Sequence, residues 1–169
     1  AHVYMGSGGT VLNRGTIKAD GGFATIGADC GIKNYATIEA HDNVFLISGE
    51  DIYNGVELSG NQTSANNNIH VYAGKDILLL AVDGLDNRAD LFAGIYADGT
   101  ASIGGNVYLD NFEILNRTDV LSDEVREQLK TFIGTEYWDA LLGVVRNDAD
   151  IKNSGNIVAN YGVTPGKGL

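Results

Sequence analysis

VLNRGTIKADGGFATIGA, residues 11–28, is the stretch that decides the fold. Its first nine residues follow the pattern apolar-x-Asn-x-small-x-apolar-x-small, so residues of one kind recur at every second position. Successive side chains of a β-strand point to opposite faces, and this period of two therefore predicts a strand with one buried face. The glycine pair at residues 21–22 predicts a tight turn, after which the alternation resumes.

The nine-residue pattern returns along the chain and always keeps Asn at its third place. The copies are VLNRGTIKA (11–19), IKNYATIEA (32–40), IYNGVELSG (52–60), LDNRADLFA (85–93), ILNRTDVLS (114–122) and IKNSGNIVA (151–159). The first three begin at residues 11, 32 and 52, and a strand that recurs about every 20 residues is typical of a solenoid. Longer intervals between the later copies indicate segments inserted as loops. We predict an all-β fold, a parallel β-helix of about six coils.

The repeated Asn residues are predicted to form one column inside this solenoid. Neighbouring parallel strands lie ~4.8 Å apart, which brings equivalent amide side chains of adjacent coils within hydrogen-bonding reach. The predicted ladder comprises Asn13, Asn34, Asn54, Asn87, Asn116 and Asn153. Its role is structural.

Further alternating segments between the copies are predicted to complete each coil. Residues 24–28 alternate as Ala-x-Ile-x-Ala, and Phe45, Ile47 and Gly49 are assigned to the same face of the equivalent strand one coil on. The length of 169 residues favours a single domain, residues 1–169. The chain begins with Ala and in mid-coil, so a processed or excised polypeptide is expected.

Residues 122–147 break the strand pattern and are predicted to be a helical insertion between coils. Apolar residues recur there at helical spacing in two stripes. The stripes are Val125, Leu129, Phe132 and Ile133, followed by Trp138, Leu141, Leu142 and Val145. Ser122 is a suitable N-cap, and two short helices are expected, packed on each other or on the side of the coil stack. Tyr137 and Trp138 either anchor this insertion to the β-helix or form a contact site for a sugar ring or another protein.

Composition excludes several classes of partner. The net charge of −11 and the pI near 4.4 argue against nucleic acid and against anionic lipid, because both require a basic face. The longest apolar run, residues 77–82, is too short for a membrane span of ~20 residues. The single Cys30 cannot form an internal disulfide and is interpreted as an inert turn or core residue rather than a reactive thiol.

The stretch VLNRGTIKADGGFATIGA, together with the recurrence of Asn at the third place of every copy, resembles the coil repeats of filamentous-haemagglutinin-like exoproteins. Those exoproteins are secreted by the two-partner route. The resemblance covers most of the chain outside residues 122–147. It implies a right-handed parallel β-helix that forms an extracellular rod at the bacterial surface. Members of that family serve in adhesion, biofilm cohesion or contact-dependent inhibition, and the resemblance names no receptor.

Catalysis and metal binding are alternatives, because β-helices also carry polysaccharide lyases and hydrolases. Asp29 and Glu50 are expected at equivalent places of adjacent coils, but no basic residue is reliably placed beside them to stabilise a developing anion. Asp83, Asp86 and Asp90, near a Gly turn, are weak candidates for a calcium site. We therefore predict no catalytic residue, no bound metal and no cofactor.

Two sequons of the glycosylation type occur, at Asn61 and Asn116. Asn61 lies in a polar loop, residues 61–68, and is a glycosylation candidate if the producing cell has the machinery. Asn116 is assigned to the internal column and is expected to be inaccessible.

These features predict a structural or adhesive module that is extracellular or exposed at the cell surface. Its stiff rod would present loops to a glycan or protein of a host or bacterial surface, with no insertion into a membrane.

Two alternatives stay open. One is a filament subunit that forms a homo-oligomer by end-to-end coil stacking, and the other is a β-helical polysaccharide lyase or hydrolase.

Overall fold

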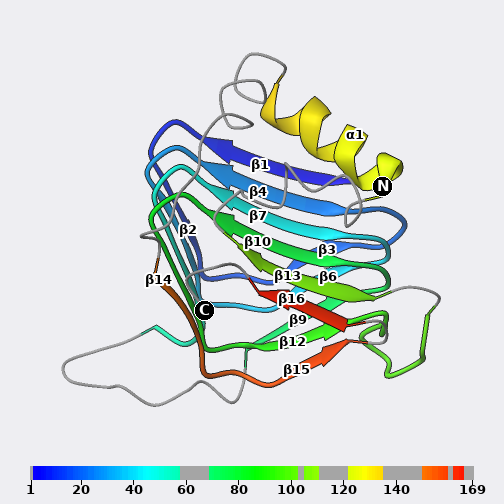
Figure 1. The fold of residues 1–169 in the computed structure, drawn as a ribbon. Coiled ribbons are helices and arrows are strands. Elements are labelled where there is room, and N and C mark those ends of the chain that lie inside the picture. The colour runs from blue at the N-terminus through cyan, green and yellow to red at the C-terminus, as the bar shows by residue number, and fades with distance from the viewer. Residues whose placement is uncertain are drawn as a thin grey trace.

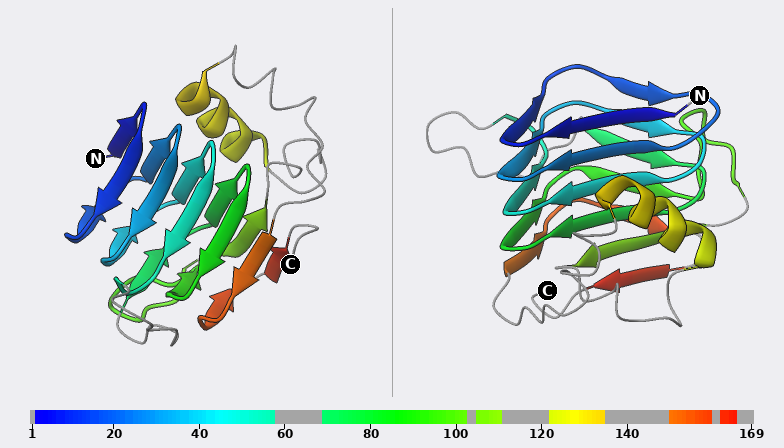
Figure 2. Two further views of the ribbon diagram at one scale, coloured as in Figure 1. Left: turned by 90° about the vertical axis from the view of Figure 1, so that its left-hand side faces the viewer. Right: turned by 90° about the horizontal axis from the view of Figure 1, so that it is seen from above.

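The computed structural model describes residues 2–57, 69–102, 105–110, 122–134, 150–159 and 162–165. Strands dominate this part of the chain and form three parallel sheets, arranged as the faces of a parallel β-helix (Figure 1). Each coil contributes one strand to each sheet, and the coils lie one upon the next (Figure 2). The prediction of a parallel, solenoid-like all-β fold is confirmed.

The three sheets are named A, B and C in the order in which the chain enters them. Sheet A contains β1 (Val3–Ser7), β4 (Ala24–Ala28), β7 (Val44–Ser48), β10 (Ile77–Ala81), β13 (Asn106–Asp110) and β16 (Gly162–Pro165). Sheet B contains β2 (Thr10–Asn13), β5 (Gly31–Asn34), β8 (Asp51–Asn54), β11 (Gly84–Asn87) and β14 (Asp150–Asn153). Sheet C contains β3 (Ile17–Ala19), β6 (Ile38–Ala40), β9 (His70–Ala73), β12 (Asp90–Ala93) and β15 (Ile157–Ala159). The described residues therefore make five three-strand coils, and β16 begins a sixth.

A typical nine-residue copy is two short strands with a corner between them, and the prediction of a single strand is wrong. In the first copy, β2 ends at Asn13 in sheet B and β3 begins at Ile17 in sheet C. The Asn side chain holds the corner, since Asn13 Oδ1 accepts a hydrogen bond from the backbone N–H of Gly15 at 3.2 Å. One coil on, Asn34 Nδ2 donates to the carbonyl oxygen of Ala36 at 2.8 Å. The alternation continues across the corner because the inward side chains of both strands fill the same interior.

Five Asn side chains form a continuous amide ladder along the interior of the stack. Asn13 Nδ2 donates to Asn34 Oδ1 at 2.7 Å, and Asn34 Nδ2 donates to Asn54 Oδ1 at 2.7 Å. Asn54 Nδ2 donates to Asn87 Oδ1 at 2.8 Å, and Asn87 Nδ2 donates to Asn153 Oδ1 at 2.7 Å. The three middle members have no exposed surface, so their polar groups depend on protein partners instead of bulk water. All these bonds run in the same direction, which lets each one polarise the next.

Asn116 is not a member of the ladder between Asn87 and Asn153, and its predicted place is wrong. Strand β11 pairs directly with β14, and Asn87 lies opposite Asn153 with no coil between them. Asn116 itself lies outside the described residues, in the long segment between β13 and β14.

The corner that follows Asn153 is packed closely against the preceding coil. A Cβ added at Gly155 would overlap the carbonyl oxygen of Ala89 in the coil below, so this corner has room for glycine only.

The predicted inward face of β7 is also wrong. Val44 and Leu46 point into the interior between the three sheets, where they join the main aliphatic core. Phe45 and Ile47 point away from it, into a second apolar cluster. Because both faces of this strand are apolar, its alternation does not tell the two faces apart.

Helix α1 (Asp123–Ile133) covers the outer face of sheet A, which explains the second cluster (Figure 1). Ser122 caps the helix, since its Oγ accepts a hydrogen bond from the backbone N–H of Val125 at 3.2 Å. Val125 and Leu129 are buried against residues of the coils. Those residues are Phe23, Phe45, Ile47, Leu78, Leu80 and Tyr108. The first predicted helix, its N-cap and its packing on the side of the stack are confirmed, and the second predicted stripe lies outside the described residues.

One glycine and one polar contact fix α1 in place. The ring of Phe132 lies against β4, where a Cβ built at Gly27 would be 2.6 Å from Phe132 Cε1. Asn43 Nδ2 donates to Gln128 Oε1 at 3.0 Å. Within the described part of the chain, no helix has the length and apolar character needed to cross a bilayer.

Replacing Asn54 with Asp should destabilise the fold strongly. The new carboxylate could still accept a hydrogen bond from Asn34, but it would face Asn87 Oδ1 with no proton to donate and would place a charge in the interior. We expect the free energy of unfolding to fall by about 3 to 5 kcal/mol, measured by urea denaturation followed by circular dichroism.

Asn153→Asp is the matched control, because Asn153 lies at the exposed end of the ladder and would keep its acceptor for Asn87. Its loss should be about 1 kcal/mol or less. Equal losses in the two variants would contradict the proposed role of the ladder.

Gly27→Ala should loosen α1 through a collision with Phe132. We expect a loss of about 1 to 3 kcal/mol in the wild-type background, which is typical of overpacking. In a Phe132→Ala background the added methyl group has space, so the same change should cost much less. Urea unfolding of the four proteins of this cycle measures the coupling, and additive losses would show that Gly27 and Phe132 do not touch.

Candidate functional site

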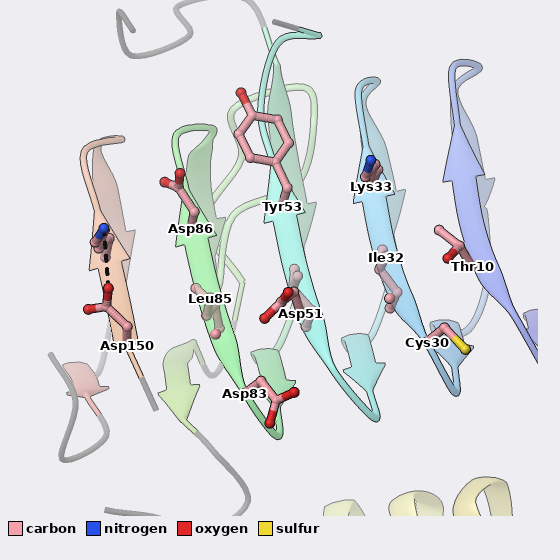
Figure 3. Close-up of a pocket in the computed structure, with 14 residues that line it drawn as sticks. Thr10, Cys30, Ile32, Lys33, Asp51, Tyr53, Asp83, Leu85, Asp86 and Asp150 are labelled. Atoms are coloured by element: carbon pink, nitrogen blue, oxygen red, sulfur yellow. Dashed lines mark ion pairs between the residues drawn. The ribbon is translucent and has the colours of Figure 1, made fainter. Parts of the chain in front are cut away.

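The outer face of sheet B presents two columns of residues, with one residue from each strand in each column. Figure 3 draws the members of both columns other than Leu12. The first column is Thr10, Gly31, Asp51, Gly84 and Asp150. The second column is Leu12, Lys33, Tyr53, Asp86 and Lys152. Most of these residues line a shallow groove of about 460 Å³.

Two glycines shape the first column of this groove. Gly31 and Gly84 flank Asp51, which leaves its carboxylate as the one side chain between Thr10 and Asp150 in that column. A Cβ added at Gly84 would lie 3.0 Å from Asp51 Oδ1, so a larger residue there would displace the carboxylate. The glycines therefore keep the space around Asp51 open.

Two other acids of the groove, Asp86 and Asp150, each lie beside a cation two residues away in the sequence. Lys152 Nζ lies 3.2 Å from Asp150 Oδ2, as the dashed line in Figure 3 marks. Arg88 Nη2 lies 3.1 Å from Asp86 Oδ2 at the end of the neighbouring strand. The Lys152–Asp150 pair is exposed and contributes little to stability, whereas the Arg88–Asp86 pair is half-buried. The mixture of charges and a Tyr ring suits reversible polar contacts better than proton transfer.

Aromatic and cationic side chains continue from the groove onto the corner between sheets B and C. The ring centroids of Tyr53 and Tyr35 are 5.9 Å apart, edge to face. The guanidinium of Arg88 lies 5.6 Å from the Tyr53 centroid, and that of Arg14 lies 5.9 Å from the Tyr35 centroid. Burial raises the pKa of Tyr53, whose hydroxyl donates to the carbonyl oxygen of Val56 at 2.6 Å. This corner is therefore a packed surface rather than a reactive one.

The first pair of acids singled out from the sequence is out of register by one residue. Pairing of β4 with β7 and of β5 with β8 places Asp29 opposite Gly49. The same registers place Glu50 opposite Cys30, and the prediction that Asp29 and Glu50 occupy equivalent places is wrong. Cys30 is exposed in this turn, in agreement with its interpretation as a turn residue.

The three calcium candidates do not converge. Asp83 lies between β10 and β11, and Asp86 points outward from sheet B toward Arg88. Asp90 begins β12 in sheet C, where its Oδ1 accepts a hydrogen bond from the backbone N–H of Asn156 at 3.1 Å. Among the described residues, no group of three His, Cys, Asp or Glu side chains could hold a metal ion. The calcium hypothesis is therefore withdrawn for these three residues.

Tyr137, Trp138 and Asn61 lie outside the described residues. The contact site at the first two and the glycosylation at the third stay predictions.

The outer face of sheet C, where aromatic side chains gather, was not predicted from the sequence. Strand pairing aligns an outward column of Lys18, Glu39, Tyr72, Phe92 and Val158. The rings of Tyr72 and Phe92 stack with centroids 4.8 Å apart and planes 13° apart, and the His70 ring lies 5.9 Å from each. One signal was present in the sequence, since Phe92 takes the place in its copy that Lys18 and Glu39 take in earlier copies. Tyr72 lies outside the nine-residue copies, so its place in this column follows only from the strand pairing.

No protein-family model matches the chain, and neither a curated protein nor a solved structure gives a match. Its function is therefore inferred from the chemistry of its surfaces.

Asp76, just before β10, is an acid with a perturbed pKa. Burial is the main cause that raises the pKa of Asp76. Its Oδ1 accepts a hydrogen bond from the backbone N–H of Asn106 at 2.8 Å, which ties down the start of β13. Burial, together with the charge of Asp76, raises the pKa of Tyr108 to about 12. A raised carboxyl pKa can mark a catalytic acid, but the hydrogen bond to a strand terminus favours a structural role.

Replacing Asp76 with Asn should remove a pH dependence from the stability of the fold. Because the native pKa of Asp76 is raised above 3.8, its protonated form favours the native state, and this contribution is lost as pH rises through the native pKa. Asn does not titrate and can still accept the bond from Asn106. Urea unfolding between about pH 3 and pH 7 should show the variant gaining stability relative to wild type as pH rises. A difference that stays constant with pH would contradict this assignment.

Proposed function

We propose that this chain is a structural and adhesive β-helix module of a bacterial exoprotein, exposed outside the cell or at its surface. The observation that carries the proposal is the amide ladder, which holds the coils in one register. A stack held in this way is a stiff body, and the outer faces of sheets B and C are not used by its interior packing. Such a body can present contact residues at fixed spacing along its length.

The placement of the inserted segments supports a display function. One segment is inserted between β8 and β9, and a longer one between β13 and β14. In both places the strands on either side keep their regular pairing with neighbouring coils. Insertions that leave a scaffold undisturbed are where binding residues are commonly found.

Charge and sequence pattern support the proposed location. The net charge of −11 disfavours docking on anionic lipid and on nucleic acid, which leaves a glycan or a protein as the partner. The coil repeats resemble those of filamentous-haemagglutinin-like adhesins. Contacts along a rigid rod would be individually weak and would gain strength from their number.

A head-to-tail filament is a second candidate. Strands β1, β2 and β3 form the same end of all three sheets in the described part of the chain, and β16, β14 and β15 form the other. Sheet edges of this kind are templates for pairing with another copy. Electron microscopy over a range of concentrations distinguishes long rods, expected for a filament subunit, from single short particles.

Labelling of intact producing cells tests the proposed location and contact function together. Antibodies raised against the purified chain should label the cell surface or the culture fluid without permeabilisation. Beads coated with the chain should then be retained on host or bacterial cells under flow, and beads coated with Asn54→Asp should be retained less, because the contact surface depends on the fold. Labelling only after permeabilisation, or retention no greater than that of albumin-coated beads, would contradict the proposal.

Release of reducing or unsaturated sugars from a panel of polysaccharides would instead favour the lyase or hydrolase alternative. We expect none, because Asp86 and Asp150 in the sheet B groove are each held by a neighbouring cation.

A further inference from the structure

A second groove, of about 290 Å³, lies where the outer face of sheet C turns toward sheet A. Its floor comes from adjacent coils, with Glu39 on β6 directly beside Tyr72 on β9. Tyr72 is half-buried and is supported from the next coil by the stacked ring of Phe92. The floor therefore presents an aromatic ring in a fixed orientation beside a carboxylate.

A hairpin from the segment between β12 and β13 forms the wall of this groove. The hairpin projects from the stack and is closed by an antiparallel bridge between Ile95 and Ala101 (Figure 1). Within it, the backbone N–H of Tyr96 donates to the carbonyl oxygen of Thr100 at 3.0 Å. Asp98 Oδ1 accepts a hydrogen bond from the backbone N–H of Thr100 at 2.8 Å, which rigidifies the tip. The wall is therefore an ordered element that carries a second Tyr and a second carboxylate.

The hairpin is seated against the coils by close packing. The Tyr96 ring lies 5.2 Å from the His41 ring, centroid to centroid. Gly74 allows this approach, since a Cβ there would be 2.5 Å from Tyr96 Cε1 and would overlap the carbonyl oxygen of His41. Tyr96 thus faces the groove from a position that the fold sets.

The charge of the groove restricts its occupant. Lys18 Nζ lies 3.5 Å from Asp20 Oδ1 and 3.9 Å from Glu39 Oε2, so the lysine is already shared between two acids. Hydrogen bonding to Thr100 lowers the pKa of Asp98, which is therefore charged at neutral pH. Three carboxylates against one lysine line the groove, and they repel sulfated or uronate polymers and anionic membranes.

We infer that this groove binds an oligosaccharide of uncharged pyranose units. The C–H face of a pyranose ring stacks on an aromatic face, here that of Tyr72 or Tyr96, which carries the negative side of the ring quadrupole. The ring hydroxyls donate to carboxylate oxygens, supplied by Glu39 and Asp98. A concave site with aromatic surface and a few convergent polar groups is the usual form of a small-ligand site. The inference rests on the proposed contact function only for the source of the sugar, which would be a glycan on a cell surface.

Isothermal titration calorimetry of the full chain with defined hexaoses tests the inference. The probes are cellohexaose, chitohexaose, maltohexaose and mannohexaose, with hexagalacturonate as the acidic comparison. We expect saturable binding of at least one neutral hexaose and none of the acidic one. Absence of binding by all four neutral probes, or tighter binding of hexagalacturonate, would overturn the inference.

Substitutions locate the binding in this groove. Tyr72→Ala should weaken the binding by about tenfold or more, whereas Tyr72→Phe keeps the ring and most of the affinity. Tyr96→Ala changes the hairpin outside the coil stack, so it should lower the affinity without unfolding the protein. The matched control is Tyr35→Ala on the corner between sheets B and C, which should leave the affinity unchanged. If Tyr35→Ala weakened the binding as much as Tyr72→Ala and Tyr96→Ala, the assignment to this groove would be wrong.

The two proposals fail separately. If no neutral hexaose bound in the calorimetric titration, the surface labelling of intact cells and the bead retention would be unaffected. Labelling confined to permeabilised cells would refute the extracellular module without affecting the hexaose titration.

Discussion

The amide bond between Asn side chains of successive coils is the interaction on which the rest of the structure depends. A buried amide group without partners costs about 2 to 7 kcal/mol, so each Asn requires a neighbour above and below. That requirement is met only when the coils stack in register, because a slip of one residue would turn the Asn to the opposite face. The same side chain holds the corner from sheet B to sheet C in several coils. Register and corner are therefore set by one residue type.

Once the register is set, the three outer faces acquire different roles. The outer face of sheet A is apolar and is covered by α1, so it belongs to the interior. The outer face of sheet B carries charges and the Tyr53 ring, and that of sheet C carries stacked rings bordered by carboxylates. Because strands of successive coils are parallel and aligned, residues that are far apart in the sequence become neighbours in a column. Both grooves draw residues from such columns, and recognition of an extended ligand is a natural use for them.

The periodic pattern of the sequence predicts the strands, their stacking and the Asn ladder. It does not predict which copies lie next to each other or which face of an apolar strand is turned inward. The recurring Asn predicted the stack and five members of the ladder, because amides that recur on the inward face of stacked coils can satisfy one another's hydrogen bonds. Those members are Asn13, Asn34, Asn54, Asn87 and Asn153. Asn116 was misplaced because its copy has the same pattern as the others, and only the pairing of β11 with β14 shows which copy lies next to Asn87. The face of β7 was misassigned because both of its faces are apolar. The sheet C groove needs the coil register and the hairpin that carries Tyr96, and neither can be read from a nine-residue pattern.

The most direct test of the ladder is hydrogen exchange of the Asn side-chain amides, followed by NMR on protein labelled with nitrogen-15 at Asn only. The account predicts that the Nδ2 protons of Asn34, Asn54 and Asn87 exchange as slowly as the core backbone amides, because they open only when the stack unfolds. It also predicts cross-peaks between the amide groups of successive Asn residues, including Asn87 with Asn153. Rapid exchange of all Asn side chains, or a contact of Asn87 with Asn116 in place of Asn153, would contradict it.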